Sequence, residues 1–257
     1  MMKLTFLGTG TSTGVPSLSC SCETCMSTDQ RDRRMRSSAL LETNDKKLLI
    51  DCGPDFYHQM LAYHRFGDID AALITHTHYD HLGGVDDLRP YCNEHKFPIY
   101  CQPNVADDLR NRVPYCFAEN PYPGVPTFDI HYVEPMQRFS IGNVDILPVP
   151  IMHGKLLIVG YIFNHRLAYI TDAKTIPQET FDALKGVDTL IINALRHKEH
   201  HSHMNLDQAL EAIEKIAPRK AYLTHLAHTM GTHAETSKLL PANVEIAFDG
   251  LTIEING

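Results

Sequence analysis

The chain has 257 residues, 43% of them hydrophobic, and a formal net charge of −8 with its 16 histidines counted as neutral. This acidic balance disfavours broad binding to nucleic-acid backbones, although a local cationic site can still attract a small anion. No apolar run approaches the roughly 20 residues that a membrane-spanning helix needs, and the first residues lack a signal peptide's apolar core. We therefore expect a cytoplasmic protein with neither a membrane nor a nucleic-acid partner.

Short β-rich segments recur along the chain. They predict strands at Lys3–Leu7, Ala39–Glu42, Lys47–Asp51, Ala71–Thr75, Ile99–Cys101, Val144–Pro148, Ile158–Phe163, Leu167–Thr171, Thr189–Asn193, Ala221–Thr224 and Glu245–Ala247. Helical spacing predicts helices at Pro54–His64, Val105–Arg112, Pro177–Leu184, Leu206–Ile216 and His233–Leu240. The two kinds of segment alternate without a linker, so we expect one α/β domain over residues 1–257. The pattern fits two sheets packed inside helices, with strand ends that converge on one rim.

Four potential metal ligands stand within six residues, directly after a predicted strand: His76, His78, Asp80 and His81. Imidazole and carboxylate groups bind divalent zinc, manganese or iron. On a turn that leaves a strand, the first two side chains can face one ion, and the other two can face a second. The alternative is a solvated His-rich loop, which the placement between a strand and a helix disfavours.

Further candidate ligands end other predicted strands, where functional side chains tend to lie. They are His153, Asp172 and His225, and each of them taken alone is more readily explained as structural. Asp51 also ends a strand. We interpret it as a carboxylate that orients the site rather than one that binds metal.

Three of the seven cysteines, Cys20, Cys22 and Cys25, are clustered in a loop at about residues 18–27. In an intracellular chain such a cluster favours metal binding over a disulfide, and structural zinc requires four ligands. We expect one structural zinc on this triad, with His228 as the fourth ligand. The alternatives are three free thiols in a flexible loop and a redox pair.

The order of these markers resembles the metallo-β-lactamase superfamily. They run Asp51, His76-x-His78-x-Asp80-His81, His153, Asp172 and His225. The resemblance implies a four-layer αββα sandwich, with two mixed sheets flanked by helices. It implies two ligand sets, one for each ion: His76, His78 and His153; and Asp80, His81 and His225. Asp172 would bridge the two ions.

The N-terminal segment Gly8-Thr9-Gly10-Thr11-Ser12 and the closing Phe248-Asp249-Gly250-Leu251 narrow the resemblance. With the cysteine triad, they resemble the subgroup that contains phosphoribosyl 1,2-cyclic phosphate phosphodiesterases and PqqB proteins. That subgroup implies a structural zinc beside a two-metal centre, and a homodimer. In its phosphodiesterase branch a histidine before a helix acts near the scissile phosphate, and His203 occupies that place here.

The function that we expect is hydrolysis of a small phosphodiester, which is cyclic in the resembling branch. Two divalent ions, zinc, manganese or iron, would lower the pKa of a bound water and so supply the attacking hydroxide. Asp80 would accept a proton from that water. His203 would protonate the leaving oxygen or donate a hydrogen bond to the phosphate.

A locally basic segment, residues 31–38, stands out in this acidic chain. One interpretation is an anchor for a second substrate phosphate, with Arg36 and Ser37 as the contacting residues. The other interpretation is a solvated loop, as most runs of charge are. The sequence leaves both open.

Three other functions compete with the phosphodiesterase prediction. A transfer-RNA 3′-processing nuclease of the same superfamily carries a long Gly/Pro-rich arm, and none is evident here. A lactonase or thioesterase could use the same metal pair. A non-catalytic PqqB-like metal-binding protein is disfavoured by the complete ligand set.

Overall fold

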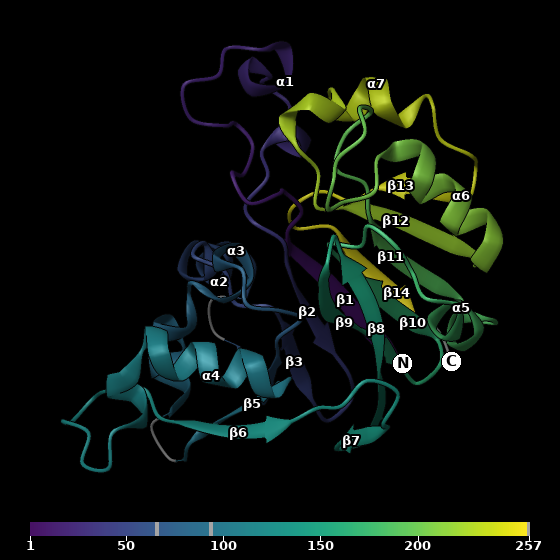
Figure 1. The fold of residues 1–257 in the computed structure, drawn as a ribbon. Helices are drawn as coiled ribbons and strands as arrows, with labels where there is room; N and C mark the ends of the chain where they lie inside the picture. The colour runs from purple at the N-terminus through teal and green to yellow at the C-terminus, as the bar shows by residue number, and fades with distance from the viewer. Residues whose placement is uncertain (65–66, 93–94, 256–257) are drawn as a thin grey trace.

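The computed structural model describes residues 1–64, 67–92 and 95–255, and in these ranges it contains two seven-stranded mixed sheets (Figure 1). The first sheet has the order β14-β1-β2-β3-β4-β5-β6. Its strands are β1 (Met2–Gly8), β2 (Ser38–Glu42), β3 (Lys47–Ile50), β4 (Ala71–Leu73), β5 (Phe97–Cys101), β6 (Phe128–Tyr132) and β14 (Thr252–Ile255).

The second sheet has the order β13-β12-β11-β10-β9-β8-β7. Its strands are β7 (Phe139–Ile141), β8 (Val144–His153), β9 (Leu156–Phe163), β10 (Leu167–Ile170), β11 (Thr189–Asn193), β12 (Lys220–Thr224) and β13 (Val244–Ile246). In each sheet the pairings are antiparallel on one side and parallel on the other. The two halves of the chain therefore repeat one arrangement.

Helices cover the outer faces of both sheets. On the first sheet lie α2 (Phe56–Tyr63), α3 (Tyr79–Leu82) and α4 (Pro103–Arg112), with the 3₁₀ turns η2 (Val85–Cys92) and η3 (Pro114–Phe117). On the second lie α5 (Gln178–Leu184), α6 (Leu206–Ile216) and α7 (His233–Ser237). The short α1 (Glu23–Met26), η1 (Gln30–Asp32) and η4 (His228–Met230) belong to loops at the rim (Figure 1).

Apolar side chains fill all three interfaces between these layers. Buried Phe6, Tyr161 and Phe163 lie in the cluster between the two sheets. A second cluster packs under α2 and α4, and a third under α5 and α6. Burial of both faces of each sheet explains why the central strands read as continuous apolar runs. The predicted four-layer αββα sandwich is therefore confirmed.

α6 shows how closely local sequence can determine an element. Asn205 accepts a hydrogen bond from the backbone of Gln208, whose side chain bonds back to Asn205, so the helix begins with a capping box. Leu206 and Ile213 are among its buried residues, and it ends at Ala217 in the left-handed region. The predicted bounds of this helix are correct.

Three strands were not predicted, β6, β7 and β14, and each lies at the edge of a sheet. Edge strands are short and carry polar residues on the face they leave to solvent, so their apolar signal is weak. In the other direction, β8 is longer than expected and runs through His153. No helix in the described part of the chain is long and apolar enough to cross a bilayer.

Candidate metal centre

The predicted ligands meet at one rim, because they follow strands whose carboxyl ends lie side by side. Asp51 follows β3, Asp172 follows β10 and His225 follows β12. These three residues have φ angles of 61°, 56° and 56°, in the left-handed region that non-glycine residues rarely adopt. Such strain costs about 1–3 kcal/mol at each residue and is typical of functional sites.

The first predicted set is brought together by the ends of β4 and β8. Donor atoms of His76, His78 and His153 all lie within 4.8 Å of one another. His153 donates from Nδ1 to the backbone oxygens of Asp172 and Ser202, at 2.8 and 2.9 Å. In the neutral form of this ring, donation from Nδ1 leaves Nε2 as the nitrogen that can act as a ligand.

The second predicted set, Asp80, His81 and His225, is equally close. Oδ2 of Asp80 lies 3.3 Å from Nε2 of His81 and 3.4 Å from Nε2 of His225. The carboxylate of Asp172 lies beside the same two nitrogens, with Oδ2 3.2 Å from His81 and Oδ1 3.2 Å from His225. Asp172 thus lies beside the second ligand set. It also forms a close group with His76 of the first set and His81 of the second, so it lies between the two sets.

These donor sets fit divalent metal ions. Ligand atoms held about 2.1 Å from a tetrahedral ion are roughly 3.4 Å apart, close to the separations of 3.2–3.4 Å around Asp80 and Asp172. Among the described residues, Nε2 of His76 and Nε2 of His81 are buried without a hydrogen-bond partner. Since buried polar atoms are normally bonded, a cation would account for these two among the eight unpartnered buried atoms of the described residues.

Electrostatics favour the metal-binding forms of two of these groups and oppose that of a third. Burial lowers the pKa of His76 well below its ordinary value, which keeps the imidazole neutral. Burial opposes ionisation of Asp172, but His225 and His81 outweigh it and hold the pKa of this carboxyl well below its usual range. A neutral imidazole and an ionised carboxylate are the forms that ligate a cation. Burial lowers the pKa of His81, but Asp172 and Asp80 outweigh it and raise this pKa well above its ordinary value, so the ring carries a proton that a bound cation would displace.

Asp51 lies behind the ligands, fully buried. Its Oδ2 is 2.7 Å from Nδ1 of His81, and its carboxylate also accepts the backbone N–H and the hydroxyl of Thr75. Because the Thr75 hydroxyl donates to Asp51, it must accept from Nδ1 of His76, 2.9 Å away. One carboxylate therefore orients an imidazole from each set, as carboxylates behind metal ligands do.

His203 stands beside this cluster. Its Nε2–H donates to Oδ1 of Asp172 at 2.9 Å, and its Nδ1 lies 3.1 Å from Ser202 Oγ and from His200 Nδ1. Burial lowers the pKa of His203 to about 4. Of the competing histidines, His197 donates from Nε2 to the carbonyl of Met230 at 2.9 Å and makes no hydrogen bond to Asp172 in the described part of the chain, whereas His203 does.

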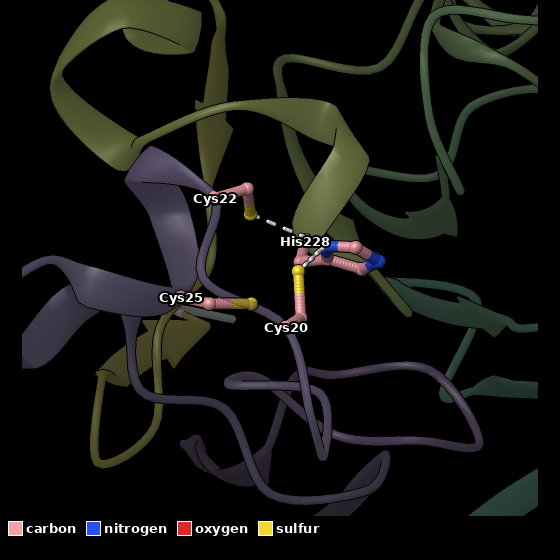
Figure 2. A group of neighbouring side chains, drawn as sticks. All are labelled: Cys20, Cys22, Cys25 and His228. Carbon is pink, nitrogen blue, oxygen red and sulfur yellow. Dashed lines mark hydrogen bonds between the residues drawn. The ribbon is translucent and has the colours of Figure 1, made fainter.

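The four residues predicted to hold structural zinc converge on one point. Figure 2 shows the sulfurs of Cys20, Cys22 and Cys25 around the His228 ring. The Cys20 and Cys22 sulfurs lie 3.4 and 3.3 Å from Nδ1 of His228. His228 begins η4, three residues after His225, so this cluster ties the loop around α1 to a turn of the predicted centre.

The two predicted substrate contacts, Arg36 and Ser37, have different surroundings. Nη1 of Arg36 lies 2.9 Å from Oδ1 of Asp55, and its Nε donates to the carbonyl of Ser12. Ser37 is fully buried, and its hydroxyl donates to the carbonyl of Gly10 at 2.9 Å. We therefore correct the assignment of Ser37, which supports the loop and has no surface for a substrate.

Two supporting residues escaped the sequence reasoning. Thr75 links Asp51 to His76, although nothing in its type or spacing distinguishes it from any strand-end threonine. Arg112, at the end of α4, donates from Nη2 to the carbonyl of Thr77 at 2.9 Å and so holds the ligand turn from outside. Its contact depends on packing between distant segments, which spacing does not reveal.

The chain is similar to several known proteins. A protein named octanoyltransferase from Porphyromonas gingivalis (strain ATCC BAA-308 / W83) is 42% identical over 97% of this chain, and the chain spans about half, 51%, of its length. A crystal structure of a diphosphatase from the PhnP family matches with a TM-score of 0.91 and 36% identity, covering 100% of this chain and 98% of that one. Zinc-bound PqqB from Methylobacterium extorquens shares the fold, with a TM-score of 0.81, 16% identity and coverage of 98% and 100%.

The Beta-lactamase superfamily domain matches residues 46–226, which is well over half of the chain and contains the strands from β3 to β12. This span includes both ligand sets, His203 and Asp51. The chain therefore belongs to the metallo-β-lactamase superfamily, within which it resembles the PhnP family.

Proposed function

We propose that this hydrolase is a phosphodiesterase that uses two divalent ions and acts on a small, cyclic or acyclic phosphodiester. The observation that carries the proposal is the place of His203, whose Nε2–H points at Oδ1 of Asp172 beside both ligand sets. A hydrogen-bond donor there can reach a phosphate oxygen held at the centre. The diphosphatase likeness supports phosphoryl chemistry in general.

The ligand sets would hold the ions as predicted, with Asp172 between them. Zinc and manganese suit imidazole and carboxylate, and iron is the third candidate. When bound, two such ions activate water and neutralise the charge that develops on a phosphate. The cysteine cluster would hold a separate structural zinc, because four thiolate and imidazole donors form a closed set.

The chain's own residues supply orientation and proton handling. Asp51 fixes the ring of His81 so that Nε2 faces Asp80 and Asp172. Asp80 offers a carboxylate oxygen that can accept a proton from the attacking water. His203 holds a proton on Nε2 and can donate it as a hydrogen bond to a phosphate or leaving oxygen. Because burial lowers its pKa to about 4, the ring is neutral at about pH 7, and outright protonation of a leaving oxygen falls to the minor imidazolium form.

Replacement of His203 tests this assignment. We expect His203→Ala to lower turnover of bis-p-nitrophenyl phosphate about 100-fold or more, the usual contribution of a positioned acid or base. Metal content measured by elemental analysis should stay unchanged. His58→Ala, at an exposed position on α2, is the control. Unchanged turnover in His203→Ala would remove the role of this residue.

A second candidate is hydrolysis of a diphosphate bridge, which the name of the PhnP-family structure favours. Parallel assays on a cyclic phosphodiester, a diphosphate-bridged dinucleotide and a lactone separate these chemistries. Preference for the lactone would overturn both phosphoryl proposals. The octanoyltransferase name does not carry over, because about half of that protein lies outside the match.

The remaining expectations stay predictions from the sequence. We propose a homodimer, which light scattering would test, and a small phosphorylated substrate without a nucleic-acid partner, which a gel shift with transfer RNA would test. A cytoplasmic location also stays a prediction. Arg36 remains a candidate substrate contact, since its pairing with Asp55 leaves part of the guanidinium exposed.

A further inference from the structure

The arginines of the basic segment, residues 31–38, lie in two separate parts of the structure. Arg36 is paired with Asp55 near the predicted centre, whereas Arg31, Arg33 and Arg34 line a cavity of about 330 Å³ behind it. None of the residues that line this cavity belongs to the ligand sets described above. It lies between the loop that carries η1 and the turn that precedes β14.

Arg34 is a largely buried cation that contacts no carboxylate directly in the described part of the chain, although Asp249 is near enough to stabilise its charge. Its side chain is almost fully enclosed, with the residue only 6% exposed. Nη1 donates to the hydroxyl of Thr9 at 2.8 Å and to the carbonyl of Ala247 at 2.6 Å. Within residues 1–64, 67–92 and 95–255, its Nε and Nη2 have no hydrogen-bond partner and its guanidinium forms no ion pair. Neither nitrogen is among the fully buried, unpartnered atoms of the described residues, so both reach the solvent of the cavity, and two donors of a largely buried cation offer a place for an anion there.

Asp249 also lines the cavity, but its carboxylate is already engaged. Oδ1 accepts the backbone N–H and the hydroxyl of Thr9 at 2.8 and 2.7 Å, and Oδ2 accepts the N–H of Met35 at 2.6 Å. Its link to Arg34 therefore passes through the Thr9 hydroxyl. This arrangement holds the guanidinium in place without satisfying its remaining donors.

The other walls define the chemistry of an occupant. Arg33 is exposed at the cavity, and Arg31, although paired with Asp29, adds positive charge in an otherwise acidic protein. Guanidinium groups match the several oxygens of a phosphate. Tyr63 and Phe248 supply aromatic surface. The volume is larger than a phosphate ion and reaches the lower range of small-molecule sites.

We propose that this cavity is a second, non-catalytic site that binds a small phosphate monoester, with the phosphate on Arg34 and Arg33 and the organic part against Tyr63 and Phe248. The cavity is linked to the candidate metal centre through Thr9, which accepts from Arg34. The carbonyl of Thr9 accepts the N–H of Leu226 at 2.9 Å, and Leu226 directly follows His225.

Equilibrium dialysis of the metal-loaded full chain against radiolabelled inorganic phosphate tests the site. Arg33→Glu reverses an exposed charge at the cavity, so the fold is retained even where Arg34→Gln would unfold the chain. We expect Arg33→Glu to weaken one class of phosphate site about tenfold or more, the loss of a charge-assisted contact with added repulsion. Phosphate that binds at the metal centre binds equally to the unaltered chain and to Arg33→Glu, so its contribution cancels when the two are compared.

Arg166→Glu is the matched control, because Arg166 is an exposed, ion-paired arginine far from the cavity residues in sequence. It should bind phosphate as the unaltered chain does. Equal binding by all three proteins would overturn the site. Phenylphosphonate, which adds a ring, should displace the phosphate that Arg33→Glu loses. If it displaces only the phosphate that Arg33→Glu retains, the cavity does not bind a phosphorylated organic molecule.

Discussion

The carboxylate of Asp51 and the imidazole of His81 form a fully buried pair, with Oδ2 of the first 2.7 Å from Nδ1 of the second. This contact turns Nε2 of His81 toward Asp80 and Asp172. The same carboxylate accepts two hydrogen bonds from Thr75. Asp51 therefore couples the orientation of His81, in the second ligand set, to Thr75, which directly precedes the first residue of the first set.

Asp51→Asn preserves the volume of this side chain but replaces one acceptor oxygen with an amide donor. Whichever way the amide turns, its NH2 faces a donor, either Nδ1–H of His81 or the backbone N–H of Thr75, so the hold on the His81 ring is weakened. We expect metal affinity to fall about 10–100-fold, the usual effect of altering such a partner. Competition with a chromogenic chelator measures it. Asp129→Asn, at an exposed position, is the control, and equal affinity in both variants would contradict the orienting role.

Thr75 provides a test of the link to His76. Thr75→Val removes the hydroxyl that donates to Asp51 and accepts from Nδ1 of His76. Because it leaves the buried Nδ1–H of His76 without an acceptor, we expect a loss of about 1–3 kcal/mol in the free energy of unfolding, with weaker metal binding. Thr75→Ser keeps the hydroxyl and should restore both. Urea unfolding and chelator competition decide, and equal values for the two variants would exclude the link.

The ligands could be predicted from sequence because their geometry follows from topology. Strand ends of parallel neighbours meet at one rim, so residues that end strands, such as Asp172 and His225, come together whatever loops intervene. The four-layer fold could be predicted from the resemblance of the ordered markers to the metallo-β-lactamase superfamily, whereas the strand and helix pattern alone indicated two sheets packed inside helices. His228 could be predicted for a related reason, because it lies three residues after the candidate ligand His225.

The rest depended on contacts that sequence spacing does not encode. Ser37 looked like a substrate contact in a basic segment, yet the chain packs it against Gly10. Arg34, a neighbour of similar appearance, is buried in a cavity. The positive φ of Asp51 is likewise imposed by tertiary structure, because aspartate alone does not favour it.

Removal of one thiolate tests the cysteine cluster. Cys25→Ser replaces a buried sulfur that lies with Cys20, Cys22 and His228. We expect the chain to lose about one equivalent of zinc and to unfold at a lower temperature, because structural zinc contributes directly to folding. Cys92→Ser, a partly buried cysteine outside the cluster, is the control. Full zinc content in Cys25→Ser by elemental analysis would refute the assignment.

Asp249 should make stability depend on pH. Burial raises the pKa of this carboxyl to about 7, from an ordinary value of 3.8. Below about pH 4 the group is protonated in both the folded and the unfolded chain. Between about pH 4 and 7 the unfolded chain releases the proton while the folded chain retains it, so the unfolded state gains. Stability that is fully present below pH 4 is therefore lost as pH rises through 7.

Asp249→Asn removes this titration and keeps one acceptor oxygen for the Thr9 donors. The free energy of unfolding of the variant, relative to the unaltered chain, should thus increase from pH 5 to 8. A full shift allows up to about 1.4 kcal/mol per pH unit, and partial exposure of the residue reduces the expected total to about 2 kcal/mol. Urea unfolding across this range measures the difference, in which groups common to both proteins cancel. Parallel pH profiles would show that the Asp249 carboxyl is already ionised in the fold.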